Sequence, residues 1–510
     1  MSKRYNVLLI TADHARHDAV ACNLDSKESS SLARIVETPN LDRLAAQGVT
    51  FRNSYTTNPI CVPARATITT GCYSHRCTGS KNNGGAIRAD QVKLAEHFAA
   101  HGYATIACGK LHYVPYSPPG TPRLVHGFQT VDLCEEGRAV AKFDPLGEQA
   151  GIEDYHDYLK SVGWGGYERA HGIGNNDVHP AASPLPAEHH EEAWVAERAV
   201  ARLREHLDER PEMPFLMWAS FSKPHPPYDA PRPWDGMYDP REVPEPLGGW
   251  ECEGLLDGRD VELKTRRNYY GWEKLSKEAV QVSRAFYCGV MSFQDAMVGR
   301  MLDFLDEAGL TDSTIVVYTS DHGDLLGDFG RFFKSNMFDG SAKVPHIWSV
   351  PGVIPRNDPH VRDQLVGPHD ILPTLAALTG CPLPCGVDGA DITAILRGVA
   401  APGRPFLVAQ THDPPCQKYM VRTAKWKYVY CELGGTEELY DMTLADRELR
   451  NMAADPRAAP VKDELRGTLI RWCVENGDDK MVQDGRLAVS PADGLPEPKF
   501  EAGRMGWRKY

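Results

Sequence analysis

Residues 7–14 read Val-Leu-Leu-Ile-Thr-Ala-Asp-His, an apolar run that gives way to polar and charged residues. A continuous apolar run is typical of a strand that is buried on both faces of a parallel sheet. It is too short for the core of a secretory signal peptide, and no small-residue cleavage site follows it. We therefore interpret these residues as the first buried strand of a sheet, with Asp13 and His14 at its carboxyl end.

Three further apolar runs end in the same way. Residues 103–108 lead into Gly-Lys-Leu-His, residues 215–221 into Ser-Lys-Pro-His, and residues 314–319 into Ser-Asp-His-Gly-Asp. Helical segments closed by glycine lie between them, the longest at 277–308. Strands that alternate with helices predict an α/β fold with a large, mostly parallel sheet flanked by helices.

Open sheets of this kind bind their ligands outside the carboxyl ends of the strands. Residue types that bind metals or anions stand at each of the four predicted strand ends. They are Asp13 and His14, Lys110 and His112, Lys223 and His225, and Asp321 and His322. We expect these four pairs to converge on one site.

Beyond Pro405 the apolar runs become shorter, as in the strands of a small antiparallel sheet, and a predicted helix follows at 460–475. We expect a smaller C-terminal α+β domain, followed by an arm that would join copies of the chain in a homo-oligomer. The predicted parts are an α/β catalytic domain (1–400), the α+β domain (401–475) and the arm (476–510). The stretch 135–195, rich in Gly, His and acidic residues, is interpreted as an inserted loop region near the mouth of the site.

The composition argues against several classes of partner. The chain has 510 residues and a net charge of −13, which argues against nucleic acid. No apolar run reaches the length that spans a bilayer, so we expect no membrane association. The thirteen cysteines, without an export signal, predict free thiols in a cytoplasmic protein.

A second informative stretch is residues 60–71, Ile-Cys-Val-Pro-Ala-Arg-Ala-Thr-Ile-Thr-Thr-Gly. It contains Cys61-x-Pro63-x-Arg65 at the expected start of a helix, where a proline costs no hydrogen bond. The N–H groups of a helix start, together with Arg65, suit an anionic substrate and an activated residue 61. The alternative interpretation is a buried thiol without a catalytic role.

Asp13, His14, Asp321 and His322 are the predicted ligands of one divalent metal. Oxygen ligands favour Ca²⁺ or Mg²⁺, whereas imidazole shifts the preference toward Mn²⁺ or Zn²⁺. The ligand types therefore leave the identity of the metal open, and we expect Ca²⁺ or Mn²⁺.

With these motifs in place, the chain resembles the type I sulfatase family of the alkaline-phosphatase superfamily. The resemblance rests on Cys61-x-Pro63-x-Arg65, Gly-Lys-Leu-His, Lys-Pro-His-Pro-Pro-Tyr and Ser-Asp-His-Gly-Asp, and it extends from residue 5 to about 455. His14 departs from the family, which has Asp, Asn or Gln at that ligand position. The resemblance implies an enzyme that hydrolyses a sulfate monoester, either a small molecule or a saccharide, to an alcohol and inorganic sulfate.

The resemblance also implies roles for the predicted site residues. A formylglycine-generating enzyme would oxidise Cys61 to formylglycine, whose hydrate would attack sulfur with the help of the metal and Arg65. Lys110 and His112 would contact the formylglycine and the ester oxygen, and His225 would protonate the leaving oxygen. The residues that bind sulfate would be Lys223, Lys334 and, as a weaker candidate, Asn82.

Two alternatives remain open at this point. A phosphonate monoester or phosphodiester hydrolase of the same superfamily would share the metal, Cys61 and Arg65, but usually lacks the Lys and His of the Gly-Lys-x-His element. A non-catalytic binding protein with this fold would be expected to have lost a ligand or the nucleophile, and the sequence shows no such loss.

Overall fold

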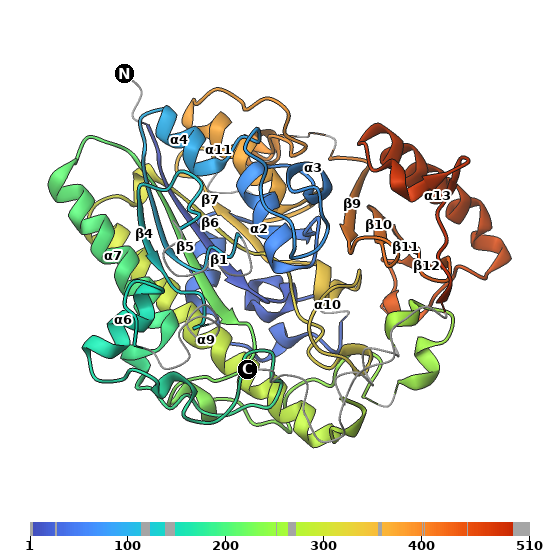
Figure 1. The fold of residues 1–510 in the computed structure, drawn as a ribbon, viewed down its shortest axis with the longest axis horizontal. Helices are drawn as coiled ribbons and strands as arrows, with labels where there is room; N and C mark the ends of the chain where they lie inside the picture. Colours follow the sequence, from blue (N-terminus) through green and yellow to red (C-terminus); the bar gives the residue numbers. More distant parts are fainter. Residues whose placement is uncertain are drawn as a thin grey trace.

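The fold is described from a computed structural model of the chain. The described residues are 4–25, 28–113, 123–137, 148–250, 252–263, 272–354, 360–399, 401, 403–445 and 447–492. Figure 1 shows a large lobe, in which helices surround a central sheet, and a smaller lobe built from the orange-to-red end of the chain. Among these residues, no helix is both long and apolar enough to cross a membrane.

The central sheet has eight strands. From one edge to the other they are β4 (Thr130–Leu133), β3 (Ala104–Gly109), β5 (Phe215–Pro224), β1 (Asn6–Asp13), β6 (Thr314–Ser320), β7 (His346–Ser349), β2 (Val49–Ser54) and β8 (Val361–Val366). The first five strands are parallel, β7 is antiparallel to both of its neighbours, and β2 and β8 pair in parallel. The prediction of a large, mostly parallel sheet is therefore confirmed.

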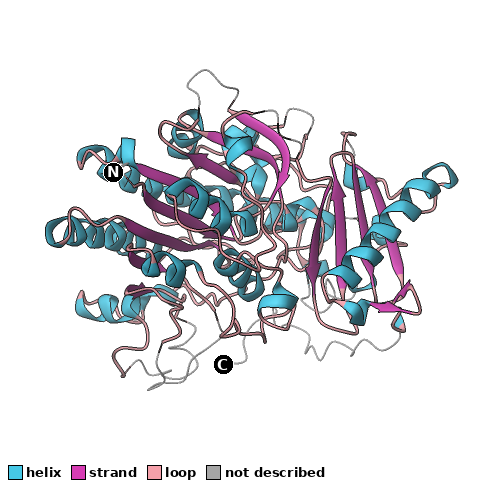
Figure 2. Cartoon of the chain, turned by 90° about the horizontal axis from the view of Figure 1, so that it is seen from above, coloured by secondary structure: helices cyan, strands magenta, loops and turns pink. Residues whose placement is uncertain are grey.

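Helices cover both faces of this sheet (Figure 2). In chain order the helices are α1 (Pro39–Ala46), α2 (Cys61–Thr70), α3 (Ser74–Cys77), α4 (Leu94–Ala100), α6 (Asp154–Ser161), α7 (Glu191–Glu209), α9 (Lys277–Glu307), α10 (Asp339–Ala342), α11 (Ile371–Thr379), α12 (Thr393–Leu396) and α13 (Ala459–Glu475). Strand β1 shows why both faces must be covered, because successive side chains of a strand point to opposite faces. Val7 and Leu9 pack with α2, α4 and α11, whereas Leu8 and Ile10 pack with α1, α7 and α9.

The smaller lobe is a four-stranded antiparallel sheet with one long helix. Its strands are β9 (Phe406–Thr411), β10 (Lys418–Thr423), β11 (Trp426–Cys431) and β12 (Thr436–Asp441). Val408 on one face packs against Leu469 and Trp472 of α13. Leu407 on the other face belongs to an apolar cluster with Phe338 of the large lobe. The predicted small α+β architecture is thus confirmed.

Two sequence predictions need refinement. The described part of the expected arm, 476–492, packs back on the small lobe through Met481, Leu487 and Ala488, which share a core with α13. This part therefore lies in the small lobe, because its apolar side chains cover that core, and residues 493–510 lie outside the described residues. The stretch 135–195 is not a plain loop, since it contains α6.

Candidate active site

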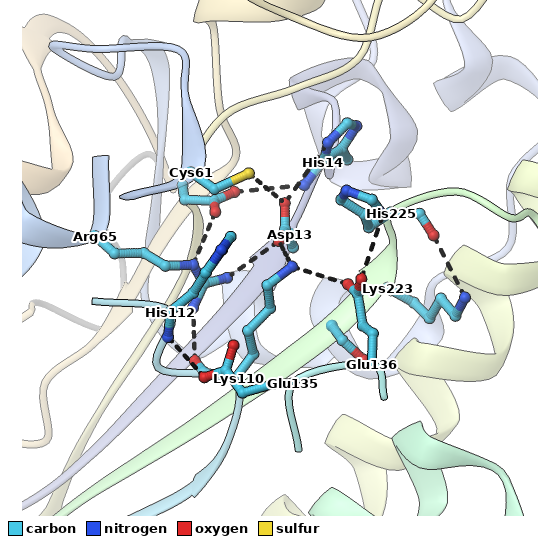
Figure 3. Close-up of polar contacts among 12 residues, drawn as sticks. Asp13, His14, Cys61, Arg65, Lys110, His112, Glu135, Glu136, Lys223 and His225 are labelled. Carbon is cyan, nitrogen blue, oxygen red and sulfur yellow. Dashed lines mark hydrogen bonds and ion pairs between the residues drawn. The ribbon is translucent and has the colours of Figure 1, made fainter. Parts of the chain in front are cut away.

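The ends of the central parallel strands bring the predicted site residues together. Strand β1 lies between β5 and β6, and Asp13 is its last residue. Hydrogen bonds continue past the strand ends: the N–H of Asp321 donates to the Ala12 carbonyl (3.2 Å), and that of Lys110 to the Ser220 carbonyl (2.8 Å). Figure 3 shows Asp13, Lys110 and His225 side by side at this edge of the sheet.

Cys61 is the first residue of α2, and its side chain is buried in this cluster. Its Sγ lies 3.2 Å from His322 Nε2 and 3.8 Å from Asp13 Oδ1. Burial and the Asp13 carboxylate would raise the pKa of the Cys61 thiol, but Lys334, His322 and a hydrogen bond with His112 outweigh them and hold it well below its ordinary value. A low pKa of this origin is typical of a reactive position rather than of an inert buried thiol.

Arg65 lies one turn along α2 and is fully buried. Its Nε donates to Asp321 Oδ2 (3.0 Å), and its Nη1 donates to the Lys110 carbonyl (2.6 Å) and to Ser220 Oγ (2.9 Å). The guanidinium therefore joins the ends of β3, β5 and β6 to the helix that carries residue 61. Its positive charge lies inside the cluster, and its hydrogen bonds fix the positions of the surrounding groups.

The donor atoms for a metal lie close together. One ligand atom each from Asp13, His14, Cys61 and His322 lies within 4.8 Å of all the others. The predicted ligand Asp321 is not part of this group but lies beside it, with its Oδ1 3.7 Å from His322 Nε2. Burial, and next the charge of Asp13, raise the pKa of Asp321, so the two carboxylates repel each other. A divalent cation would relieve this repulsion, and the mixture of carboxylate and imidazole donors fits a transition metal.

His14 is held by groups outside the donor cluster. Its Nδ1 donates to Asp324 Oδ2 (2.8 Å), which also accepts a hydrogen bond from the Tyr228 hydroxyl (3.2 Å). Its Nε2 contacts the Lys334 ammonium. Such a fixed orientation of one ring nitrogen by a carboxylate is usual for histidines that bind metals through the other nitrogen.

Backbone strain is concentrated around the cluster. Five non-glycine residues there have left-handed φ values: His14 (70°), His112 (47°), Glu136 (62°), Phe333 (68°) and Ser335 (73°). Conformations of this kind cost of the order of 1–3 kcal/mol each and persist only where the surrounding structure fixes them. Their concentration around Cys61 is typical of a functional site.

Two glutamates that sequence analysis left unassigned contact the Gly-Lys-Leu-His segment. Glu135 Oε1 accepts the N–H groups of Leu111 (3.0 Å) and His112 (2.7 Å). Glu136 Oε1 lies 2.8 Å from Lys110 Nζ, and Glu136 Oε2 lies 3.7 Å from His225 Nδ1. Only their position in an acidic stretch after the strand at 130–133 could have pointed to them, and that signal is weak.

Glu153 is the residue directly before α6. It holds in place the turn that carries Glu135 and Glu136. Its Oε1 accepts the N–H groups of Glu135 (2.8 Å) and Gly137 (3.2 Å). Burial, with smaller contributions from Glu135 and Glu191, raises the pKa of the Glu153 carboxyl to about 8. Near neutral pH this buried group is therefore largely uncharged.

We expect the stability of the protein to depend on pH through Glu153. Its pKa is higher in the folded than in the unfolded chain, so its contribution is complete below the unfolded pKa of about 4.3 and is lost as the pH rises through about 8. The Glu153→Gln variant does not lose stability in this way, because glutamine does not ionise. Its free energy of unfolding relative to wild type should increase by up to about 1.4 kcal/mol per pH unit between pH 5 and 8. Urea unfolding across this range measures the difference, and a constant difference would contradict the assignment.

Lys223 is a predicted sulfate ligand whose side chain has close partners of its own. The Lys223 ammonium lies 2.6 Å from Asp229 Oδ1 and 3.1 Å from Glu191 Oε1, and it donates to the Pro227 carbonyl (3.0 Å). Figure 3 shows this side chain directed away from Cys61. Two buried carboxylates hold the Lys223 ammonium, and its role as a sulfate ligand stays a prediction.

Asn82 is another predicted sulfate ligand, and this role stays a prediction. Its backbone N–H donates to Ser80 Oγ (3.0 Å), and its neighbour Asn83 accepts the N–H of Val62 at the start of α2 through Oδ1 (3.3 Å). Asn83 is therefore the asparagine that contacts the helix carrying Cys61. Sequence analysis did not assign a role to Asn83.

Comparison with known proteins identifies relatives over most of the chain. A family model described as Sulfatase matches residues 5–381, and one described as N-sulphoglucosamine sulphohydrolase, C-terminal, matches residues 327–475. The chain is 28% identical to the arylsulfatase of Clostridium perfringens, covering 91% of this chain and 94% of that protein. It is 29% identical to the choline-sulfatase of Rhizobium meliloti, covering 83% and 79%.

The fold is also similar to solved structures. The phosphonate monoester hydrolase of Silicibacter pomeroyi superimposes with a TM-score of 0.77 at 24% identity, covering 96% of this chain and 100% of that one. At this identity the similarity concerns the fold, which supports the assignment of a large α/β lobe and a small antiparallel lobe.

Proposed function

The chain belongs to the sulfatase family, and on this premise we propose that it is a sulfuric ester hydrolase that cleaves a sulfate monoester into an alcohol and inorganic sulfate. The names of its relatives, an arylsulfatase and a choline-sulfatase, support this reaction class. We take the substrate to be a small-molecule or saccharide sulfate.

The observation that carries the proposal is the position of Lys334 and His112 beside Cys61, with Lys110 in contact with the neighbouring Asp13. A sulfate monoester is an anion with three peripheral oxygens, and several cationic donors can engage it at once. Lys110 and Lys334 bring two ammonium groups to the cluster, and the Lys334 charge acts on Cys61 itself. Such preorganised positive charge stabilises the charge that develops on sulfate oxygens in the transition state.

Two groups would complete the site. A divalent metal held by Asp13, His14, Asp321 and His322 supplies additional positive charge for the sulfate oxygens, and the two imidazoles favour Mn²⁺ over Ca²⁺. A formylglycine, made from Cys61 by a maturation enzyme, supplies as its hydrate the oxygen nucleophile. The buried donors around Cys61 support this assignment.

The remaining steps fall to side chains of this chain. His225 gives a proton to the leaving alcohol oxygen, and His112, next to residue 61, takes a proton from the second hydroxyl when sulfate is released. Imidazole suits both tasks near neutral pH. Arg65 holds Asp321 and the end of β3 in place during both steps.

We expect sulfate monoesters to exceed phosphonate monoesters in kcat/KM. A phosphonate ester has an organic substituent where one sulfate oxygen would lie, so it offers one oxygen fewer to the ammonium groups of Lys110 and Lys334. Lys110→Ala should lower kcat/KM for an aryl sulfate about 100-fold or more, and should lower any phosphonate activity less. Matched 4-nitrophenyl sulfate and 4-nitrophenyl phenylphosphonate, assayed on one enzyme preparation, measure both effects.

The competing reaction is phosphonate monoester hydrolysis. The structural neighbour from Silicibacter pomeroyi is named after this reaction. A clear preference for the phosphonate in the matched assay would overturn the sulfatase proposal. It would leave the fold, the metal ligands and the position of residue 61 unchanged, because both reactions use them.

A further inference from the structure

We propose that Glu136 is a positioning residue for this reaction: it holds the Lys110 ammonium and orients the His225 ring. The inference rests on the proposed function, since it concerns the groups that bind sulfate and protonate the leaving oxygen. Figure 3 shows the Glu136 carboxylate between these two side chains, with one oxygen directed at each.

The first contact fixes Lys110. Its Nζ lies between two carboxylates, at 2.8 Å from Glu136 Oε1 and also in contact with Asp13 Oδ2. Without Glu136, the ammonium would be drawn to Asp13 alone, which is a predicted metal ligand. The paired carboxylates therefore hold the charge at a fixed point between the metal ligands and the leaving group.

The second contact orients His225. Its Nδ1 donates to the Pro226 carbonyl (2.7 Å), and Glu136 Oε2 lies on the same side of the ring, 3.7 Å from Nδ1. The leaving oxygen then receives its proton from Nε2, which is on the side of the ring away from Glu136. A buried carboxylate behind a catalytic histidine, which keeps the ring in one orientation, is a recurring arrangement in hydrolases.

The local structure is built to hold this carboxylate in place. Glu136 has 4% of its surface exposed and adopts a left-handed conformation with φ of 62°, which is unfavourable for a residue with a side chain. The turn is held on both sides of Glu136 by Glu153, which accepts the N–H groups of Glu135 and Gly137. Glu135 in turn accepts the N–H of His112 (2.7 Å), so the same turn also fixes the second predicted histidine.

The test is the dependence of the rate on the leaving group. Proton donation matters most for poor leaving groups, so a residue that acts through His225 should affect these substrates most. Glu136→Gln keeps the size of the side chain and removes its charge. We expect kcat to fall about 100-fold on phenyl sulfate and at most about 10-fold on 4-nitrophenyl sulfate, with little change in KM.

Two further variants isolate the effect. Glu438→Gln changes a buried glutamate of β12 in the small lobe, which accepts the N–H of Asp260 (3.0 Å) and contacts neither Lys110 nor His225, so it should change both rates by the same small factor. In a His225→Asn background, Glu136→Gln should add little further loss on phenyl sulfate, because residues that act as one unit are not additive. Thermal unfolding of each variant shows whether the fold is retained.

Several outcomes would overturn the inference. No loss on either substrate would show that Glu136 acts through neither Lys110 nor His225. Equal losses on the two substrates, or full additivity with His225→Asn, would show that it does not orient His225 and acts through Lys110 alone. Failure of the proposed function is a separate result, seen as wild-type enzyme that prefers the matched phosphonates. In that case the same pair of leaving groups on phosphonate esters tests Glu136 independently.

Discussion

Cys61→Ala is expected to fold and to lose about four to six orders of magnitude in turnover, in the range seen when a catalytic nucleophile is removed. The side chain is small, and its loss leaves the α2 helix and the Arg65 contacts intact. The variant removes the only atom at this position that could become the nucleophile. Initial rates on 4-nitrophenyl sulfate, with circular dichroism as a control for folding, measure the effect.

Cys61→Ser provides the matched comparison. A serine oxygen placed like that of formylglycine can attack sulfur, but it lacks the second hydroxyl that releases sulfate. We expect this variant to accumulate one sulfo group per chain, visible as an increase in intact mass. Rates close to wild type in Cys61→Ala would end the formylglycine proposal, as would a wild-type Cys61 peptide of unmodified mass in fully active enzyme.

Asp321→Asn is expected to lower metal affinity more than about 100-fold and to abolish turnover, since removing even an indirect partner of a metal ligand costs 10–100-fold. Asparagine keeps the size of the side chain, so Arg65 retains a neutral oxygen partner in place of the carboxylate. Elemental analysis of the purified protein, which we expect to contain about one divalent metal per chain, gives a readout that does not depend on activity.

Asp328→Asn is the control for this variant. Asp328 is also a buried carboxylate, but it binds Arg16 Nη1 (2.8 Å) and the N–H of Leu247 (2.7 Å) rather than the donor cluster. It should retain its metal even if it is less stable. A full metal content in Asp321→Asn, or equal losses in both variants, would refute the ligand assignment.

The sequence alone predicted the fold and the edge of the sheet at which most of the candidate site residues meet. The apolar run at 7–10 and the polar residues after it predicted β1 and the position of its carboxyl end at the site. The predicted boundaries of α9 and β6 differ from the observed ones by at most a residue or two. Strand ends in a parallel sheet lie at one edge. For this reason Asp13, Lys110, His225 and Asp321 could be assigned to one site from their places after separate strands.

Only the tertiary structure decided which groups touch. Lys223 stands two residues before His225, yet its long side chain turns to Glu191 and Asp229, which come from the start of α7 and from a later loop. Glu136 enters the site from a turn that no periodic pattern marks. Sequence periodicity fixes which end of a strand a residue occupies, because that is a local property. The direction of a charged side chain is set by the nearest opposite charges, and these come from distant parts of the chain that meet only after folding.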